Sequence, residues 1–307
     1  MTAQHLTLLT STGWNDYELL DSGNLKKLER FGSFRFIRPE PQAIWRPRLA
    51  AEAWTADGVF QPGKTDADDH ETGGWHLKKN VPETWQMQYQ DLRFLARPTP
   101  FRHLGFFPEQ ATHWDWCSDC ICKYQQTHRR PPRILNLFAY TGLASLHAAT
   151  AGAKVTHVDA SKKAITQAFE NRDVSGLQEA PIRYIIDDAT AFVAREIRRQ
   201  REYDGIILDP PKYGRGPNGE TWHIDLDLPP LLQQLTNLLS ADAMFLVLTT
   251  YAIRASSLAA HYVLADNLGN RPGNIESGEL AIQESTVTGL SERRCVPQAN
   301  FARWLAH

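Results

Sequence analysis

The sequence predicts an α/β protein with a doubly wound parallel sheet and a small β-rich domain at the N-terminus. Two observations carry this prediction. From Arg133 onward, short apolar runs alternate with longer helical patterns, which is typical of a parallel sheet covered by helices on both faces. In residues 1–95, short aromatic runs are split by closely spaced prolines and glycines, which is typical of short strands and turns. We therefore expect two domains, 1–95 and 96–307, and consider substrate recognition as the role of the first.

The expected elements of the second domain alternate in chain order. Apolar runs that read as buried strands lie at 133–138, 154–159, 184–186, 205–209 and 244–248, with two more near 280–284 and 301–305. Helical patterns lie between them, at 142–151, 161–171, 189–201, 228–239 and 256–268. The first of these helices is rich in alanine. Ser161 can cap the second helix and Gly176 can stop it.

The composition excludes several classes of protein. The chain has 307 residues, of which 42% are hydrophobic and 22% charged, as in ordinary globular proteins. We find no apolar run of about 18 residues and no secretory signal, so we expect a cytoplasmic protein with no membrane partner. The net charge of −2 excludes a protein that binds nucleic acid over its whole surface, but not a local basic groove. The nine tryptophans are read as packing residues, with base stacking by one or two as the alternative.

The carboxyl ends of the strands are the candidate site, because ligands of such sheets bind there. The first strand runs into Asn136-Leu137-Phe138-Ala139-Tyr140-Thr141-Gly142, a loop with one glycine. A dinucleotide-binding loop needs three glycines so that its backbone can approach a pyrophosphate. A loop with a single glycine that leads into a helix suits a ligand with a carboxylate and no phosphate.

Acidic residues end the second and third strands. Asp159 can accept hydrogen bonds from both ribose hydroxyls of an adenosine, or it can cap the next helix. One carboxylate of Asp187-Asp188 can accept a bond from the exocyclic amine of adenine. Asp188 is the better candidate, because Asp187 continues an apolar run. Either residue could be a helix cap instead.

The fourth strand ends in the most specific signal, Asp209-Pro210-Pro211-Lys212-Tyr213. Two prolines cannot extend a strand, so they fix a rigid turn that directs Asp209 and the following carbonyl groups toward the ligand. This arrangement can hold an exocyclic amine or a ring edge, and Tyr213 can stack on the ring. Lys212 and Arg215 are candidates for phosphate contacts. The alternative is a turn with an N-capping aspartate.

Together these residues resemble a class I methyltransferase that uses S-adenosylmethionine. The resemblance covers residues 101–307. Within this class, the chain is most similar to the bacterial enzymes that methylate large-subunit ribosomal RNA at cytosine C5. It rests on the loop 136–142, on Val158-Asp159-Ala160-Ser161, on the turn 209–213 and on Gly105-Phe106-Phe107-Pro108-Glu109-Gln110. It implies a Rossmann-like sheet of seven strands, S-adenosylmethionine as cofactor and RNA, in particular ribosomal RNA, as partner.

The resemblance also implies roles for individual residues. The loop 136–142 would hold the methionine part of the cofactor, Asp159 with Ala160 and Ser161 the ribose, and Asp188 with Ala189 the adenine. Phe107 and Gln110 would pack against the cofactor. The catalytic group would be the turn 209–213, whose Asp209 would also contact the cofactor.

One family feature is missing. The cytosine-C5 enzymes use a cysteine nucleophile after the fifth strand. Here that stretch is Leu248-Thr249-Thr250-Tyr251-Ala252, so a ring or exocyclic nitrogen becomes the plausible acceptor, oriented or deprotonated by Asp209. A methyltransferase of proteins or small molecules, and a non-catalytic binding module, are the alternative functions.

Three further patterns in the sequence have less specific interpretations: a cysteine cluster, two basic stretches and an acidic stretch. Cys117, Cys120 and Cys122 stand near His113 and His128, but a structural zinc site usually has a second pair of ligands, so these thiols are read as buried or incidental and no metal is expected. Two basic stretches, 128–133 and 195–201, could contact phosphates or be solvated faces. Four acids within 66–71 are read as an exposed loop, with an ion site as the alternative.

Overall fold

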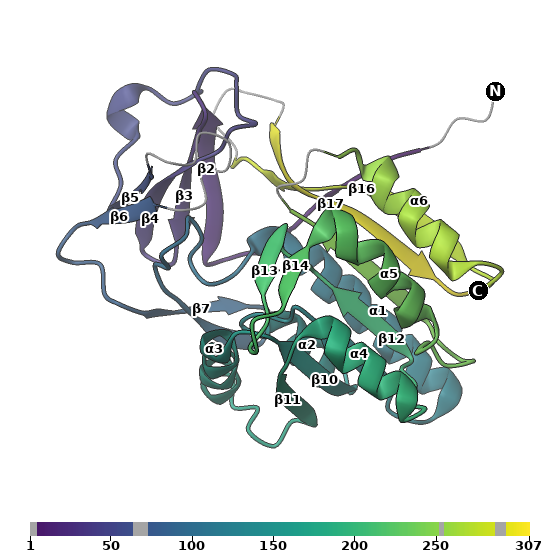
Figure 1. Ribbon diagram of the computed structural model, residues 1–307. Coiled ribbons are helices and arrows are strands. Elements are labelled where there is room, and N and C mark those ends of the chain that lie inside the picture. The colour runs from purple at the N-terminus through teal and green to yellow at the C-terminus, as the bar shows by residue number, and fades with distance from the viewer. Residues whose placement is uncertain (1–4, 64–72, 252–254, 286–292) are drawn as a thin grey trace. The chain divides into compact units, whose positions relative to one another are not determined.

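The structure is a computed structural model that describes residues 5–63, 73–251, 255–285 and 293–307 (Figure 1). The chain divides into two compact units. The α/β unit comprises Thr112–Leu280, Ala299–His307 and the start of the chain as far as Leu9. The β-rich unit comprises Thr10–Ala111 and Ala281–Gln298. The acidic stretch 66–71 and Ala252 lie outside the described residues.

An eight-stranded sheet forms the centre of the α/β unit, with the order β1-β16-β17-β15-β12-β9-β10-β11. Its strands are β1 (Thr7–Thr10), β9 (Arg133–Leu137), β10 (Lys154–Asp159), β11 (Ile182–Ile186), β12 (Gly205–Leu208), β15 (Phe245–Thr250), β16 (Asn274–Gln283) and β17 (Cys295–Leu305). The five strands from β11 to β15 run parallel, and β17 is antiparallel to β15. This confirms the predicted α/β class, and β1 adds one strand to the seven expected.

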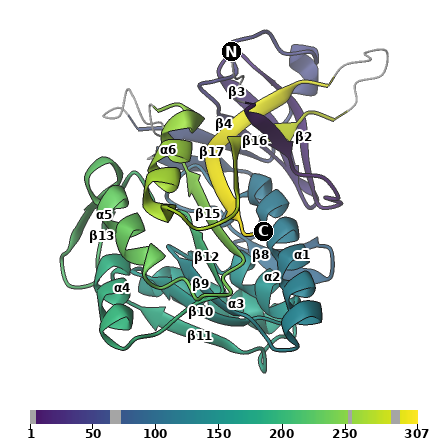
Figure 2. The ribbon, with the colours of Figure 1, turned by 90° about the vertical axis from the view of Figure 1, so that its right-hand side faces the viewer.

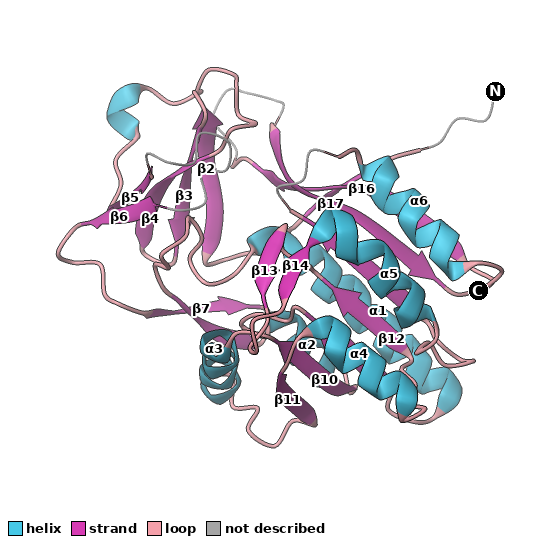
Figure 3. Ribbon diagram, in the orientation of Figure 1, coloured by secondary structure: helices cyan, strands magenta, loops and turns pink. Residues whose placement is uncertain are grey.

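In the described part of the chain, the sheet is covered by the helices α1 (Ala111–His128), α2 (Leu143–Thr150), α3 (Lys162–Val174), α4 (Ala189–Arg198), α5 (Ile224–Thr236) and α6 (Ser257–Leu268) (Figure 3). Successive residues of a buried strand face opposite sides, so each strand contributes to two cores. Leu135 packs in the core that α4, α5 and α6 form, whereas Ile134 packs in the core that α1 and α2 form. Figure 2 shows these helices on the two sides of the sheet. The unit is therefore doubly wound, as expected.

Two helices differ from the sequence prediction. The sequence analysis predicts no element over the residues of α1, whereas the structure has a helix of 18 residues there. We predicted that α5 begins near Leu228, but it begins at Ile224, so Pro229 and Pro230 lie inside it. The two prolines have no N–H to donate to the carbonyl groups one turn earlier. The prediction therefore placed the two prolines in the first turn of the helix, whereas the structure has them in its second turn.

The cap of α3 agrees with its prediction. Ser161 is the N-cap, and its Oγ accepts a hydrogen bond from the N–H of Ala164 over 3.2 Å. The helix ends at Val174, and Gly176 follows with φ of +70°, the left-handed conformation that glycine adopts at little cost.

The β-rich unit contains a five-stranded sheet and a separate hairpin. The sheet has the order β2 (Tyr17–Gly23), β3 (Lys26–Phe31), β4 (Phe34–Pro39), β5 (Gly58–Pro62) and β6 (Gly73–Leu77), and β7 (Trp85–Tyr89) pairs with β8 (Leu92–Ala96). Short 3-10 helices lie at Ala51–Ala53 and Pro108–Gln110. Phe31, Phe36 and Phe94 are among its fully buried side chains.

The limits of the two units differ from the predicted ranges 1–95 and 96–307. The β-rich unit continues to Ala111 and also takes residues 281–298 from near the C-terminus. Buried polar contacts hold this segment in the unit. Ser22 donates its hydroxyl to Glu284 over 2.5 Å, and Arg294 donates to Asp21 over 3.1 Å. Both partners of each contact are separated by more than 260 residues, so local sequence patterns could not predict them.

The tryptophans of the β-rich unit are packing residues. Trp45 donates its indole N–H to Ser22, Trp54 to Asp21, Trp75 to the carbonyl of Thr99 and Trp85 to that of Phe31. An indole tied down in this way fixes its neighbours, as the packing interpretation expected. No helix in the described part of the chain is both long and apolar enough to cross a membrane.

Candidate cofactor and active site

The loop after β9 has an unusual backbone. Phe138 and Tyr140 have φ of 53° and 48°, and Gly142 has φ of 87°. For residues with a side chain, this left-handed region costs roughly 1–3 kcal/mol each and persists only where the surroundings fix it. Conformations of this kind cluster where a backbone is shaped around a ligand. The loop predicted to bind the methionine part is thus the strained segment of this sheet edge.

Strand β10 fixes the loop. The N–H of Tyr140 donates to Asp159 Oδ2 over 2.8 Å, and the N–H of Ala139 donates to the carbonyl of Val158 over 3.1 Å. Glycine is needed at position 142, because a Cβ there would lie 3.0 Å from the Cβ of Ala168. The single glycine of the predicted loop therefore has a steric reason as well as a conformational one.

A buried polar cluster, Asn136–Ser145–His157, lies beneath the loop. Asn136 donates its side-chain amide to Ser145 Oγ over 2.9 Å, and Ser145 Oγ lies 3.0 Å from His157 Nδ1. Burial lowers the pKa of His157 to about 3, against a backbone hydrogen bond with Tyr140 that acts to raise it. Asn171 adds a bond from α3 to the carbonyl of Thr141 over 2.9 Å. These bonds hold the loop from below, and Ser145, His157 and Asn171 were not among the predicted site residues.

Asp159 is positioned as an acceptor at the end of β10. Its Oδ1 accepts from the N–H of Ser161 over 2.8 Å, and its Oδ2 accepts from Tyr140. Burial raises the pKa of Asp159, and these two N–H groups oppose that shift. A carboxylate has about four acceptor positions, so two bonds to the backbone orient it and leave capacity for hydroxyl donors. Because Ser161 caps α3, the alternative role of Asp159 as that cap is not needed. The carboxylate fits a ribose.

The acidic pair after β11 has contacts of its own. Asp188 is the N-cap of α4, and its Oδ1 accepts from the N–H of Ala191 over 2.9 Å. Asp187 pairs with Arg195. Asp188 thus has the capping role that was left open as an alternative, and its contact with adenine, beside Ala189, stays a prediction.

The Asp-Pro-Pro turn follows β12 and is held by a hairpin that the sequence analysis did not predict. Trp222 donates its indole N–H to the carbonyl of Pro211 over 2.7 Å, and Ile224 donates its N–H to the carbonyl of Lys212 over 3.0 Å. Asp209 is half-buried and Pro210 is buried, whereas Pro211, Lys212 and Tyr213 are exposed. The turn therefore presents its polar residues from a fixed backbone.

The sheet brings most of these groups to one edge. Strands β11, β10, β9 and β12 are consecutive neighbours, with Leu137 opposite Leu208 and Val158 opposite Leu137. The carboxyl ends of parallel strands lie on the same edge of a sheet. This edge therefore carries, in the order of the strands, Asp188, Asp159, the loop after β9 and the turn at Asp209. Chain order reverses between β9 and β12, which is the topological switch point where α/β proteins bind ligands.

Phe107 and Gln110 belong to the β-rich unit. Phe107 is the N-cap of the 3-10 turn Pro108–Gln110 and Gln110 is its last residue, whose N–H donates to the carbonyl of Phe107 over 3.1 Å. Their packing against the cofactor stays a prediction.

Two of the three cysteines of α1 pack in the core. Cys117 and Cys120 are buried against Ile134 and Phe245, whereas Cys122 is exposed. Burial raises the pKa of the Cys117 thiol, and it raises that of Cys120 to about 11. Among the described residues no group of three or more His, Cys, Asp or Glu side chains could hold a metal ion. The thiols of Cys117 and Cys120 therefore pack as buried side chains of the core.

The basic stretch 128–133 neutralises a buried carboxylate. Arg130 donates to both oxygens of Asp204 over 2.8 and 3.1 Å, and Arg133 adds its backbone N–H over 2.8 Å. Burial acts to raise the pKa of Asp204, but the arginines hold it well below the usual range. Asp204 immediately precedes β12, at the opposite edge of the sheet from Asp209. The second stretch is also paired in part, since Arg199 binds Glu196.

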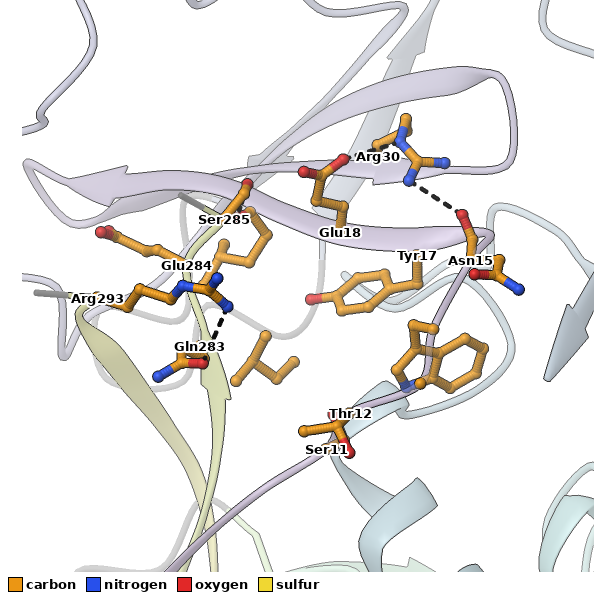
Figure 4. Close-up of a pocket in the computed structure, with 14 residues that line it drawn as sticks. Ser11, Thr12, Asn15, Tyr17, Glu18, Arg30, Gln283, Glu284, Ser285 and Arg293 are labelled. Atoms are coloured by element: carbon orange, nitrogen blue, oxygen red, sulfur yellow. Dashed lines mark hydrogen bonds and ion pairs between the residues drawn. The ribbon is translucent and has the colours of Figure 1, made fainter. Parts of the chain in front are cut away.

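The β-rich unit has a cavity of about 440 Å³ between the chain leading into β2 and residues 282–285 (Figure 4). Its charged walls are internally paired. Arg30 donates to Glu18 over 3.2 Å and to the carbonyl of Asn15 over 3.1 Å (Figure 4). Arg293 donates from its guanidinium to Gln283 Oε1 over 3.5 Å (Figure 4). None of the predicted site residues lines it.

Replacing all four cysteines by alanine is expected to leave methyl transfer largely intact, because none of the predicted site residues is a cysteine. The two buried replacements should each cost about 1 kcal/mol of unfolding free energy. Activity assays and urea unfolding check the two effects separately. If a single replacement abolishes turnover in a folded protein that still binds its cofactor, the prediction is wrong and that cysteine is the nucleophile.

The stability of the α/β unit is expected to fall with acid. Burial lowers the pKa of His113, His147 and His157 to about 3 each, with Arg303 adding to the shift at His113. In the unfolded chain a histidine titrates near 6.5. Between these values the unfolded state binds more protons, so each histidine removes about 1.4 kcal/mol of stability per pH unit as the pH falls below about 6.5. Above that pH their contribution is constant.

Urea unfolding from pH 8 to pH 5 measures this effect. His113 packs against Phe301 at 5.2 Å, and neither of its ring nitrogens has a hydrogen-bond partner in the described part of the chain. His113→Phe should therefore reduce the slope by about one proton. Stability that stays flat down to pH 5 contradicts the prediction.

The chain is similar to known proteins over different parts of its length. The family model described as "Conserved hypothetical protein 95" matches residues 119–224. Ribosomal RNA large subunit methyltransferase K/L of Shewanella baltica is 40% identical over 110 residues, and that of Vibrio cholerae is 38% identical over 111. These matches cover 35% and 36% of this chain but only 15% of each relative.

Several solved structures match nearly the whole chain. The S-adenosylmethionine-dependent methyltransferase of Agrobacterium tumefaciens has 44% identity and a TM-score of 0.91, and the match covers 98% of this chain and 94% of that one. A Streptococcus mutans protein, described as a methyltransferase of the same kind, has 15% identity and a TM-score of 0.68, over 96% of this chain and 76% of that one, and shows the fold alone. The chain belongs to the S-adenosylmethionine-dependent methyltransferases.

Proposed function

We propose that this enzyme transfers a methyl group from S-adenosylmethionine to a nucleobase nitrogen of ribosomal RNA, in the cytoplasm. The observation that carries the proposal is the alignment, along one sheet edge, of the strained loop after β9, Asp159 and the Asp209 turn. The RNA acceptor is supported by the ribosomal RNA methyltransferases that match the chain, although the chain spans only 15% of their length.

The cofactor supplies an electrophilic methyl group on a positively charged sulfur, and the chain holds it. The loop from Asn136 to Gly142 leads into α2, so its N–H groups and the helix start suit the carboxylate of the methionine part. Asp159 accepts from the ribose hydroxyls, with Ala160 and Ser161 beside it. Asp188 and Ala189, at the start of α4, flank the adenine.

Asp209 acts on the acceptor. A half-buried carboxylate at the end of β12 can accept a hydrogen bond from a nucleobase N–H, which directs the nitrogen lone pair at the methyl carbon. As the new N–C bond forms and the C–S bond breaks, the nitrogen loses its proton to Asp209 or to water. Pro210 and Pro211 fix the direction of the carboxylate, and the gain comes mainly from holding both reactants in place. Lys212 and Tyr213, both exposed, contact the acceptor. Its recognition by the β-rich unit is a further part of the proposal.

The test compares ribosomal RNA from cells with and without the gene. We expect mass spectrometry of the nucleosides to show one methylated base that disappears on deletion and returns when the wild-type gene is restored, but not when the Asp209→Asn gene is. Purified enzyme with labelled S-adenosylmethionine should then methylate ribosomal RNA from the deletion strain. Label that enters protein or small molecules and not RNA would reject the RNA acceptor while leaving the methyltransferase.

A further inference from the structure

The hairpin β13 (Tyr213–Arg215) and β14 (Thr221–His223) is a two-faced ribbon directly after the Asp209 turn (Figure 1). Its antiparallel register pairs Tyr213 with His223, Gly214 with Trp222 and Arg215 with Thr221. Paired residues point to the same face, and faces alternate along a strand. One face therefore carries Gly214 and Trp222, and the other carries Tyr213, His223, Arg215 and Thr221.

The inner face is fixed to the proposed site. Trp222 is 4% exposed and belongs to the core under α5. Its ring lies 4.8 Å from that of Phe138 in the strained loop, and its indole N–H binds the carbonyl of Pro211. The ribbon is thus attached both to the loop that holds the cofactor and to the turn that faces the acceptor.

The outer face is exposed and combines rings with cations. Tyr213 is 47% exposed, and its ring centroid lies 4.9 Å from that of His223 at an interplanar angle of 66°. Arg215 donates from Nε to the Tyr213 hydroxyl over 3.3 Å, and Lys212 is exposed at the start of the ribbon.

Two of the nearby carboxylates, Glu220 and Asp227, have other contacts. Glu220 accepts from the N–H of Asn218 over 2.8 Å and from its side-chain amide over 3.1 Å. Asp227 accepts from the backbone N–H of His223 over 2.6 Å. These bonds leave the outer face with aromatic and basic side chains to offer a ligand.

We propose that the outer face of the β13–β14 ribbon binds the single-stranded RNA next to the target base. Rings that stack on bases and cations that contact phosphates are what single-stranded nucleic acid binding requires. His223 stacks on a neighbouring base, and Arg215 contacts the backbone phosphate. This inference rests on the proposed RNA acceptor, and it extends the site beyond the residues 209–213.

The experiment measures binding of the whole enzyme to large-subunit ribosomal RNA from cells that lack the gene, by filter binding at several salt concentrations. We expect His223→Ala to weaken binding about fivefold or more, and His223→Phe to retain it, because a phenyl ring still stacks. Arg215→Gln should weaken binding and reduce the slope of log K against log salt by about 0.7. Arg183→Gln, at an exposed position on β11 outside both basic stretches, is the matched control and should change neither.

Calorimetry with S-adenosylmethionine shows whether each variant keeps the cofactor site, and we expect unchanged affinity for all four. If wild type binds the RNA but the ribbon variants behave like Arg183→Gln, the ribbon is not the contact surface and the RNA acceptor stands. If wild type does not bind the RNA, the RNA acceptor and the ribbon surface are both wrong.

Discussion

Asp209→Asn is expected to reduce the rate of methyl transfer about a hundredfold or more while changing cofactor affinity little. The amide keeps the size of the side chain, but it cannot take up a proton and it can present a donor where the acceptor base needs an acceptor. A positioned acid–base group contributes on the order of 10²–10⁴ to rate. Single-turnover assays at saturating S-adenosylmethionine, together with calorimetry, measure the two effects.

Asp225→Asn is the matched control for this prediction. Asp225 is an exposed aspartate in the first turn of α5, close in sequence to the ribbon and outside the proposed site. Its replacement removes the same charge and should leave the rate near wild type. If Asp209→Asn also turns over at that rate, Asp209 only shapes the turn, and the acceptor side of the site must be sought elsewhere.

Asp159→Ala is expected to weaken S-adenosylmethionine binding by about 1.5–3 kcal/mol, or roughly 10- to 150-fold. The change removes the acceptor for the ribose hydroxyls. It also removes the partner of the Tyr140 N–H, which helps to hold that residue at φ of 48°. Both effects act on the same ligand, so this substitution should be the most damaging of those at the cofactor loop.

Calorimetric titration and urea unfolding separate binding from stability in this variant. Asp173→Ala, which removes a half-exposed aspartate paired with Arg172 on α3, is the control and should bind the cofactor normally. Normal binding by Asp159→Ala, in a folded protein, would remove Asp159 from the cofactor site.

The sequence predicted the part of the fold that local patterns determine. Runs such as Ile134-Leu135 and Ile206-Ile207 are apolar on both faces, and only a strand covered on both sides explains them. The cap at Ser161 and the stop at Gly176 could also be predicted, because each depends only on residues nearby in the sequence. The site followed from the fold, because the topology assigns the carboxyl ends of the strands to one edge.

What the sequence could not show depends on distant contacts. The return of residues 281–298 to the β-rich unit rests on Glu284 and Arg294 meeting Ser22 and Asp21 across the length of the chain. His157 looked like one more residue in a strand, and only the structure shows it between Ser145 and the strained loop. The short strands of the ribbon, three residues each, are too brief for a period-2 pattern to stand out.

The most direct test of the central claim is transfer of labelled methyl from S-adenosylmethionine to ribosomal RNA from the deletion strain, by wild type and Asp209→Asn side by side. The account predicts that wild type labels a single nucleoside of that RNA, that RNA from the parent strain is not labelled because the base already carries the methyl group, and that Asp209→Asn labels at least about a hundredfold more slowly. Equal labelling by the two proteins, or no labelling of the RNA by wild type, would contradict it.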